Sequence, residues 1–415
     1  MTSFSGMEEG EGARRGGSAS ATAHALAVSF LLAATAFAAL PPVFRVSPSP
    51  DELSWGRRSL VPWWFPEPRI MDKTLWSADY RQKYTQCIHH PTLARIVYRT
   101  VLTAAGYDKP PEAVWKYGAS YNENIDRGNY LPLKMRRALR LTNAAFFAAT
   151  VLVVYFGALR VLASPILAVL AALPIVVEPT MRVGYKAVVP YAGADALFIF
   201  LLVFFWYVWL FVKDRPLAAV VWLGLVGGLA VSTKVNGLFV LAAAMVYYAV
   251  FARGWLRLAV PSGILALAAA VFLALDPVYF GGGFQWGWMV FRDTVALMFR
   301  LKEVTTDTSW GSFTKMETLA GAFPYLPFIV PAAAAVWRAR SAQWFAVTFA
   351  WAVSIVVCNL ALIYMPQPRY AAPARVAFFI LVMAAGLSLW RGERESPAAV
   401  ADSPGDPGRP AGGCH

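Results

Sequence analysis

The stretch GADALFIFLLVFFWYVWLFV, residues 193–212, decides the fold class. It contains one charged residue, Asp195, and its length of about 20 residues is what a helix needs to cross a hydrocarbon core of about 30 Å. Lys213 and Arg215 follow it closely, as basic residues often do at the cytoplasmic edge of a membrane. The stretch therefore predicts a transmembrane helix with an acid at the end opposite to the basic residues.

Similar apolar runs recur along the chain. Hydrophobic residues make up 58% of the 415 and charged residues 15%, and the mean hydropathy is +0.50, values that do not suit a soluble protein. The first run is read as an uncleaved span, because Pro41 and Pro42 make a poor signal-peptidase site. We expect an all-α polytopic membrane protein with about ten transmembrane helices. The predicted ranges are 22–40, 141–161, 164–178, 193–212, 217–232, 236–251, 257–276, 319–337, 343–364 and 372–390.

The distribution of Lys and Arg supports this count and predicts an orientation. With the N-terminus in the cytoplasm, every inside connection carries at least one basic residue, as the positive-inside rule requires. These residues are Arg14, Arg15, Arg160, Lys213, Arg215, Arg253, Arg257, Arg338, Arg340, Arg391 and Arg394. Two long connections, about 41–140 and 277–318, then fall outside.

The predicted domain organisation is one transmembrane domain, 21–390, between two disordered cytoplasmic ends, 1–20 and 391–415. The ends are rich in Gly, Ser, Pro and charge, so they cannot bury enough apolar surface to become ordered. Amphipathic stretches in the two outer loops predict helices that lie in the membrane interface. These stretches are HPTLARIVYRTVLTAAG, LPLKMRRALRL and WGWMVFRDTVALMFRLKEV.

The net charge of +13 does not indicate nucleic acid, because the basic residues lie beside membrane segments, where they contact lipid headgroups. The expected partners thus include membrane lipids and exclude nucleic acid. The three cysteines, Cys87, Cys358 and Cys414, show no metal-ligand spacing.

Acidic residues gather on the predicted outer side. An acid at a membrane edge is costly to keep and is therefore a functional candidate. Asp51 and Glu52 are either a solvated loop pair or contain a general base, whose basicity a low-dielectric edge would raise. Asp195 is either a helix-start acid favoured by the dipole or a site residue. The acids near the outer face are Asp51, Glu52, Glu178, Asp195 and Asp276.

Basic residues on the same side could hold a phosphate leaving group or could extend to lipid headgroups. The donor-phosphate candidates are Lys234, Arg369, Arg182 and Lys186. His90 and Arg95 are candidates for positioning the acceptor or the loop. His89 and His90 are adjacent, which is poor spacing for a zinc site, so no metal ligand is predicted.

The order of these features resembles the GT-C superfamily of polyprenyl-phosphate-dependent membrane glycosyltransferases, which includes protein O-mannosyltransferases and aminoarabinose transferases. PDELSW after the first helix resembles the acidic pair of that family, and HHPTLAR resembles its HPPL segment. GLVGGLAVSTKVNGLFVL resembles the Gly-rich stretch between helices five and six. ADALFIFLL, FPYLPFIVP and PQPRYAAP resemble later features, and the likeness covers about 22–390.

The resemblance implies that Asp51 is the catalytic base and that Asp195 is a second active-site carboxylate. It implies that Glu52 either supports the base or helps to bind the acceptor or a metal. It places Lys234 and Arg369 near the phosphate of a polyprenyl-phosphate sugar. The implied enzyme is a hexosyl- or pentosyltransferase that acts with inversion on a hydroxyl of a glycan, lipid or protein. A divalent metal, Mg²⁺ or Mn²⁺, would be its candidate cofactor, and a bacterial plasma membrane, with the site facing the periplasm or exterior, its expected location.

Two other function classes remain open from the residues alone. A transporter or flippase of a lipid-linked or anionic substrate would share the outward acids and basic residues, although no internal repeat is visible. A non-catalytic membrane scaffold would leave the gathering of acids on one side unexplained.

Overall fold

The computed structural model describes residues 8–45, 47–48, 50–60, 92–113, 119–177, 194–276, 288, 343–361, 373–374 and 376–384. The described elements are helices, with no strand among them, which confirms the predicted all-α class. Four described helices have the length and composition to cross a membrane. They are α1 (Glu8–Arg45, over Ala21–Arg45), α7 (Leu133–Leu162), α10 (Asp195–Val212) and α13 (Leu256–Leu275).

Shorter apolar helices accompany these four. They are α8 (Pro165–Val177), α11 (Pro216–Val231), α12 (Leu238–Phe251), which follows the 3-10 turn η2 (Val235–Gly237), and α17 (Gln343–Ala361). Residues 373–374 and 376–384, within the predicted range 372–390, are also helical. The predicted range 319–337 lies outside the described residues, so the total of ten stays a prediction.

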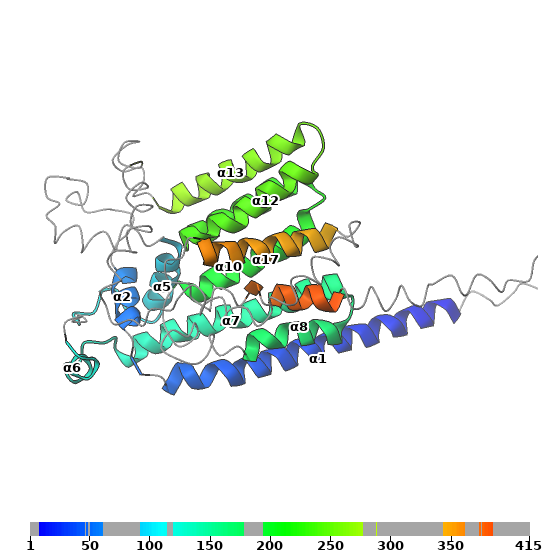
Figure 1. Cartoon of the computed structure of the whole chain (residues 1–415). Coiled ribbons are helices and arrows are strands. Elements are labelled where there is room, and N and C mark those ends of the chain that lie inside the picture. The colour runs from blue at the N-terminus through cyan, green and yellow to red at the C-terminus, as the bar shows by residue number, and fades with distance from the viewer. Residues whose placement is uncertain are drawn as a thin grey trace, which may run out of the picture.

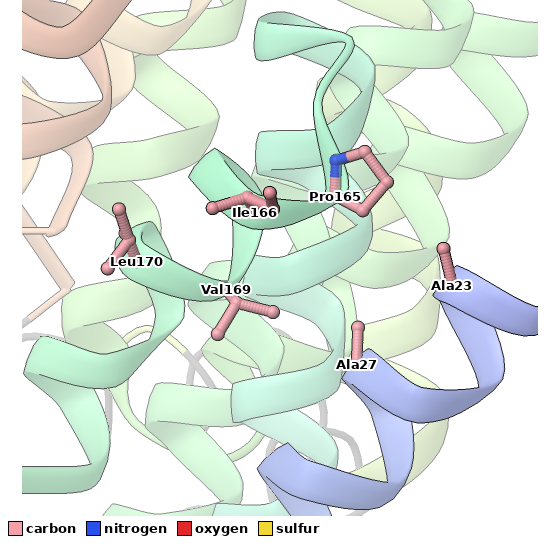
Figure 2. A pocket seen from close by; sticks show the side chains of 6 residues that line it. All are labelled: Ala23, Ala27, Pro165, Ile166, Val169 and Leu170. Carbon is pink, nitrogen blue, oxygen red and sulfur yellow. The ribbon is translucent and has the colours of Figure 1, made fainter. Parts of the chain in front are cut away.

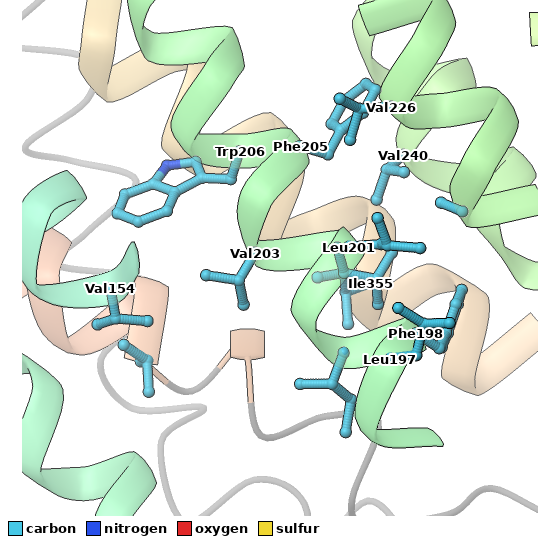
Figure 3. Close-up of a cluster of buried hydrophobic side chains, with 14 of the residues drawn as sticks. Val154, Leu197, Phe198, Leu201, Val203, Phe205, Trp206, Val226, Val240 and Ile355 are labelled. Carbon is cyan, nitrogen blue, oxygen red and sulfur yellow. The ribbon is translucent and has the colours of Figure 1, made fainter. Parts of the chain in front are cut away.

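The centre of the bundle is α10. In α10, 78% of the 18 residues are buried, against 17% of the 18 most apolar residues of α13. Helix α10 is therefore surrounded by protein, while α13 faces mainly outward. Trp206 of α10 stacks on Trp351 of α17 with centroids 5.5 Å apart, and its indole N–H donates to Thr348 at 3.0 Å. Figure 3 shows this core, in which side chains from several helices meet around α10.

Outward-facing positions of the peripheral helices are apolar. On α1, Leu26, Phe30 and Phe37 are exposed, and on α13 Leu258 is 77% exposed. A soluble monomer rarely exposes so large an apolar surface to water, whereas lipid is a favourable environment for it. The fold is therefore that of a polytopic integral membrane protein, as the sequence predicts.

Three helices gather at one end of the long ones (Figure 1): α2 (Pro50–Leu60), α5 (Thr92–Ala104) and α6 (Tyr121–Asp126). We call this end the site end. Consecutive long helices run in alternating directions. The C-termini of α1, α11 and α13 and the N-termini of α7, α10 and α12 therefore also lie at the site end. The first outer connection therefore covers one end of the bundle.

Two helix boundaries differ from the prediction. LPLKMRRALRL was expected to be a separate interfacial helix, which is wrong: from Leu133 onward it forms the first turns of α7, because no helix breaker follows Pro132. The first helix continues through Pro41 and Pro42 to Arg45 and begins at Glu8, within the stretch 1–20 predicted to be disordered. The expected interfacial helix in HPTLARIVYRTVLTAAG is present as α5.

Small residues let α11 and α13 approach closely. A Cβ on Gly228 would lie 2.7 Å from the Cβ of Val271 and 2.8 Å from the backbone oxygen of Ala268, and one on Gly224 would lie 2.8 Å from Leu267. Two glycines four positions apart on one helix face are a common contact between membrane helices.

We expect Gly228→Ala to destabilise the protein by about 1–3 kcal/mol, because α11 and α13 must separate to admit the methyl group. The measurement is thermal unfolding in detergent. Val221→Ala, on the exposed face of the same helix, is the control and should leave the midpoint unchanged. Equal midpoints for both variants would contradict the close packing.

Candidate functional site

The acidic pair after the first helix lies in the first turn of α2, where Pro50 is the first helical residue. The pair therefore does not lie in a loop, as the sequence suggests, because a proline followed by two acids is a common helix start. The structure places Asp51 in this turn and describes the side chain of Glu52, which is 1% exposed.

Glu52 forms a buried ion pair with Arg140 of α7. The Arg140 Nε lies 2.5 Å from one carboxylate oxygen, and its Nη2 donates to the other at 2.9 Å. The same guanidinium donates to the carbonyls of Val43, at 3.2 Å, and Ser47, at 3.0 Å. Arg140 therefore fastens the end of α1, the connection after it and the first turn of α2 to one point on α7.

A second ion pair joins Asp195, at the N-terminus of α10, to Lys234, which follows α11. Both were predicted from sequence as site residues, and the structure brings them together. The side chains of Asp195 and Lys234 are 11% and 25% exposed, so the pair is partly open. A Lys ammonium is a compact point charge, so the side chain could leave Asp195 and pair with the phosphate of a bound ligand.

Helix α5 lies beside both ion pairs. Its Tyr98 hydroxyl donates to Asn143 of α7 at 2.6 Å, and its ring packs edge-on against Trp55 of α2. Burial raises the pKa of Tyr98, and the negative charge of Asp195 raises it further. Asn143 lies one helical turn from Arg140, so Tyr98 links the surroundings of the two ion pairs.

Arg95 lies on the buried face of α5 and is 7% exposed. Asp276, just beyond α13, is 5% exposed and accepts hydrogen bonds from Thr92 at the start of α5. Burial raises the pKa of the Asp276 carboxyl to about 7, although the bonds from Thr92 and the charge of Arg95 oppose this. From the sequence, Asp276 is one of the predicted outer acids and has no predicted role.

The remaining predicted site residues lie outside the described residues: His90, Arg182, Lys186 and Arg369. Their roles stay predictions. Arg140 and Asn143 were missed as site residues, because the basic run that contains Arg140 was interpreted as an interfacial helix. The position of Arg140, directly before the predicted transmembrane helix 141–161, is the signal that could have found it.

A separate apolar hollow of about 220 Å³ lies between α1 and α8 (Figure 2). Only apolar side chains line it: Ala23, Ala27, Pro165, Ile166, Val169 and Leu170. Ala27 is 18 residues before the end of α1, which at 1.5 Å per residue places the hollow about 27 Å from the site end. It is therefore no part of the acidic site.

A sequence profile of the family Dolichyl-phosphate-mannose-protein mannosyltransferase matches residues 74–291, more than half of the chain. The chain belongs to this family. The match spans α5 to α13, the segment that contains Arg140, Asp195, Lys234 and Asp276. Membership confirms the predicted resemblance to the protein O-mannosyltransferases of the GT-C superfamily.

Solved structures of oligosaccharyltransferase from Archaeoglobus fulgidus are similar to this mannosyltransferase-family chain. The apo form has 12% identity and a TM-score of 0.49, with 91% of this chain and 52% of that one covered. The complex of AglB with an inhibitory peptide and a dolichol-phosphate has 13% identity and a TM-score of 0.47, covering 94% and 52%. A complex with Zn and sulfate has 14% identity and a TM-score of 0.44, covering 90% and 50%.

The chain spans about half the length of these solved structures. No curated protein matches it significantly.

We expect Arg140→Ala to destabilise the protein by about 3–5 kcal/mol, because Glu52 would remain buried and unpaired. The measurement is thermal unfolding in detergent. Adding Glu52→Gln should recover part of the loss, since it removes the orphaned charge. Arg127→Ala, which breaks an exposed ion pair with Glu123, is the control and should change little. Arg140→Ala unfolding at the wild-type temperature would contradict the anchoring role.

Proposed function

We propose that this protein transfers a sugar from a polyprenyl-phosphate-linked donor to an acceptor hydroxyl, with inversion, on the non-cytoplasmic side of the membrane. Family membership supports the donor class. The observation that carries the proposal is the Arg140–Glu52 pair, which fixes the first turn of α2, and with it Asp51, at the end of the bundle where Asp195 and Lys234 meet.

In the proposed reaction, Asp51 takes the proton of the acceptor hydroxyl. The hydroxyl oxygen attacks the anomeric carbon from the side opposite the phosphate, and the bond between that carbon and the phosphate oxygen breaks. Its electron pair leaves with the lipid phosphate, and attack from the opposite face inverts the anomeric centre. Glu52 is then a positioning residue, because both its oxygens are engaged by Arg140.

Lys234 is the described residue best placed to stabilise the leaving phosphate. It is paired with Asp195, and a phosphate that enters beside the pair would attract the ammonium more strongly than one carboxylate does. Asp195 would keep Lys234 charged and oriented until the donor arrives. Arg369, Arg182 and Lys186 remain candidates for further contacts with the phosphate, and His90 and Arg95 for positioning the acceptor.

The charge at the other end of the bundle supports the proposed sidedness. The described connections there carry Arg160, Lys213, Arg215, Arg253 and Arg257, as expected of a cytoplasmic face. The acids of the site end would then face the periplasm or exterior of, we propose, a bacterial plasma membrane.

Mg²⁺ or Mn²⁺ remains a candidate cofactor, and the proposed steps use side chains alone. Among the described residues no group of three or more His, Cys, Asp or Glu side chains could hold a metal ion. Glu52 and Asp195 each face a cation, so they do not offer an open set of oxygens for Mg²⁺ or Mn²⁺. No step is therefore assigned to a metal.

We expect Asp51→Asn to lower sugar transfer by at least about a hundredfold, because the amide cannot take up the acceptor proton. The measurement is transfer of labelled sugar by purified protein from a panel of polyprenyl-phosphate sugars to glycan, lipid and peptide acceptors. Asp108→Asn, at an exposed position after α5, is the control and should transfer at the wild-type rate.

If the wild type consumes no donor but moves a lipid-linked sugar across vesicle membranes, the flippase alternative replaces this proposal. Equal transfer by wild type and Asp51→Asn would remove Asp51 from the base role.

A further inference from the structure

Asp276 joins two parts of the chain that are far apart in sequence. Its Oδ1 accepts a hydrogen bond from the backbone N–H of Thr92 at 3.0 Å and another from the Thr92 hydroxyl, 184 positions away. Asp276 directly follows α13, and Thr92 is the first residue of α5. The contact therefore connects the end of a membrane helix to the start of the helix that covers the site.

The first amides of α5 are satisfied by remote partners. A helix start leaves backbone N–H groups without intrahelical acceptors, and a side-chain oxygen of a nearby residue normally caps them. Here Asp276 accepts from Thr92, and the carbonyl of Ser232, at the end of α11, accepts from Leu93 at 2.9 Å. The start of α5 is thus held by the ends of α13 and α11.

The residues that α5 brings to the site lie on the same face as this cap. Thr92, Arg95 and Tyr98 are three positions apart and all buried. Their spacing places them in one row on the helix, so a rotation or shift at Thr92 moves the other two. Tyr98 contacts Asn143, and the charge of Asp195 acts on it, while the charge of Arg95 acts on Asp276.

We propose that Asp276 is a positioning residue for sugar transfer: by capping α5 it holds in place Arg95 and Tyr98, the residues that α5 brings to the site. This inference rests on the proposed function of that site. Asp276 acts through α5 and has no direct part in the chemistry.

The cap is sensitive to protonation. Within the described residues the second oxygen of Asp276, Oδ2, is buried without a hydrogen-bond partner. Arg95 of α5 is the charged group that acts on the carboxyl. The helices packed against α13 add no charge beside it: α11 has no ionisable side chain, and the only ones of α12, Tyr247 and Tyr248, lie near its other end.

The cap has two states. In the closed state Asp276 accepts from Thr92 at the start of α5, and in the open state α5 is released and Asp276 is hydrated. When α5 is released and Asp276 is hydrated, the pKa of its carboxyl returns toward 3.8, whereas burial in the closed state raises that pKa to about 7. The closed state therefore binds a proton more readily, and lower pH favours it. The preference for the closed state is therefore lost as the pH rises from about 4 to about 7, and it stays constant at higher pH, where the carboxyl is ionised in both states. Transfer should accordingly decline as the pH rises toward 7.

Two substitutions at Asp276 test its charge and its role as a hydrogen-bond acceptor separately. Asp276→Asn keeps an oxygen that accepts from Thr92 but cannot ionise, so it should transfer at least as well as the wild type at pH 7 and lose the decline between about pH 4 and pH 7. Asp276→Ala removes the acceptor and should lower kcat/KM about tenfold or more, the scale of a misplaced site residue. An unchanged decline in Asp276→Asn, or wild-type kinetics in Asp276→Ala, would overturn the proposal.

A second pair of variants tests the cap from the side of α5. Thr92→Val removes the hydroxyl donor and should lower transfer, whereas Thr100→Val, on the exposed side of the same helix, should not. Equal activities for the two would count against the cap.

Hydrogen exchange gives a readout that does not depend on catalysis. The amides of Thr92 and Leu93 should exchange faster in Asp276→Ala than in the wild type, while those of α12 stay protected. Unchanged exchange at both amides would overturn the cap even if the enzyme is active. Faster exchange in a protein that transfers no sugar would instead mean that the cap exists and the proposed function fails.

Discussion

The bidentate pairing of Arg140 with Glu52 is the interaction on which the site end depends. Both side chains are 1% exposed, and a buried charge is tolerated only when it is paired and hydrogen-bonded. Arg140 meets this condition with four hydrogen bonds, two to Glu52 and two to the carbonyls of Val43 and Ser47. The path from α1 to α2 is thereby fixed, and the orientation of the first turn of α2 with it. Because α2 packs on α5 through Trp55 and Tyr98, the position of α5 depends on the same anchor.

The site end collects acids because the long helices alternate in direction. Asp195 opens α10, Lys234 follows α11 and Asp276 follows α13, so their positions in the sequence bring them to one end of the bundle (Figure 1). Three buried carboxylates at that end have different partners: Glu52 a guanidinium, Asp195 an ammonium, and Asp276 the amide and hydroxyl of Thr92. Glu52 and Asp276 hold parts of the structure together, which agrees with the proposed division into one base, for which we propose Asp51, and several positioning groups.

Hydrophobic runs and basic edges predicted the helices and the end at which the acids gather, since both depend on burial and lipid contact along the chain. The pairings could not be predicted in the same way. Glu52 and Arg140 are 88 positions apart, and Thr92 and Asp276 are 184 apart, so no local pattern relates them. The anchor was missed because KMRRALR is basic and amphipathic enough to suggest a surface helix, whereas α7 buries Arg140 within the protein. Asp195 and Lys234 were each predicted from their own surroundings, but their contact depends on how α10 packs on α11.

A double-mutant cycle on sugar transfer between Asp51→Asn and Arg140→Gln tests most directly whether the Arg140–Glu52 pair positions Asp51. If Arg140 acts by orienting the turn that carries Asp51, Arg140→Gln lowers the rate in the wild-type background and has almost no further effect once Asp51 is replaced. The stability of each variant is measured beside its activity, so that only folded protein is compared. Rate losses that multiply would contradict the account, because they would mean that Arg140 and Asp51 act independently and that the buried ion pair does not position the base.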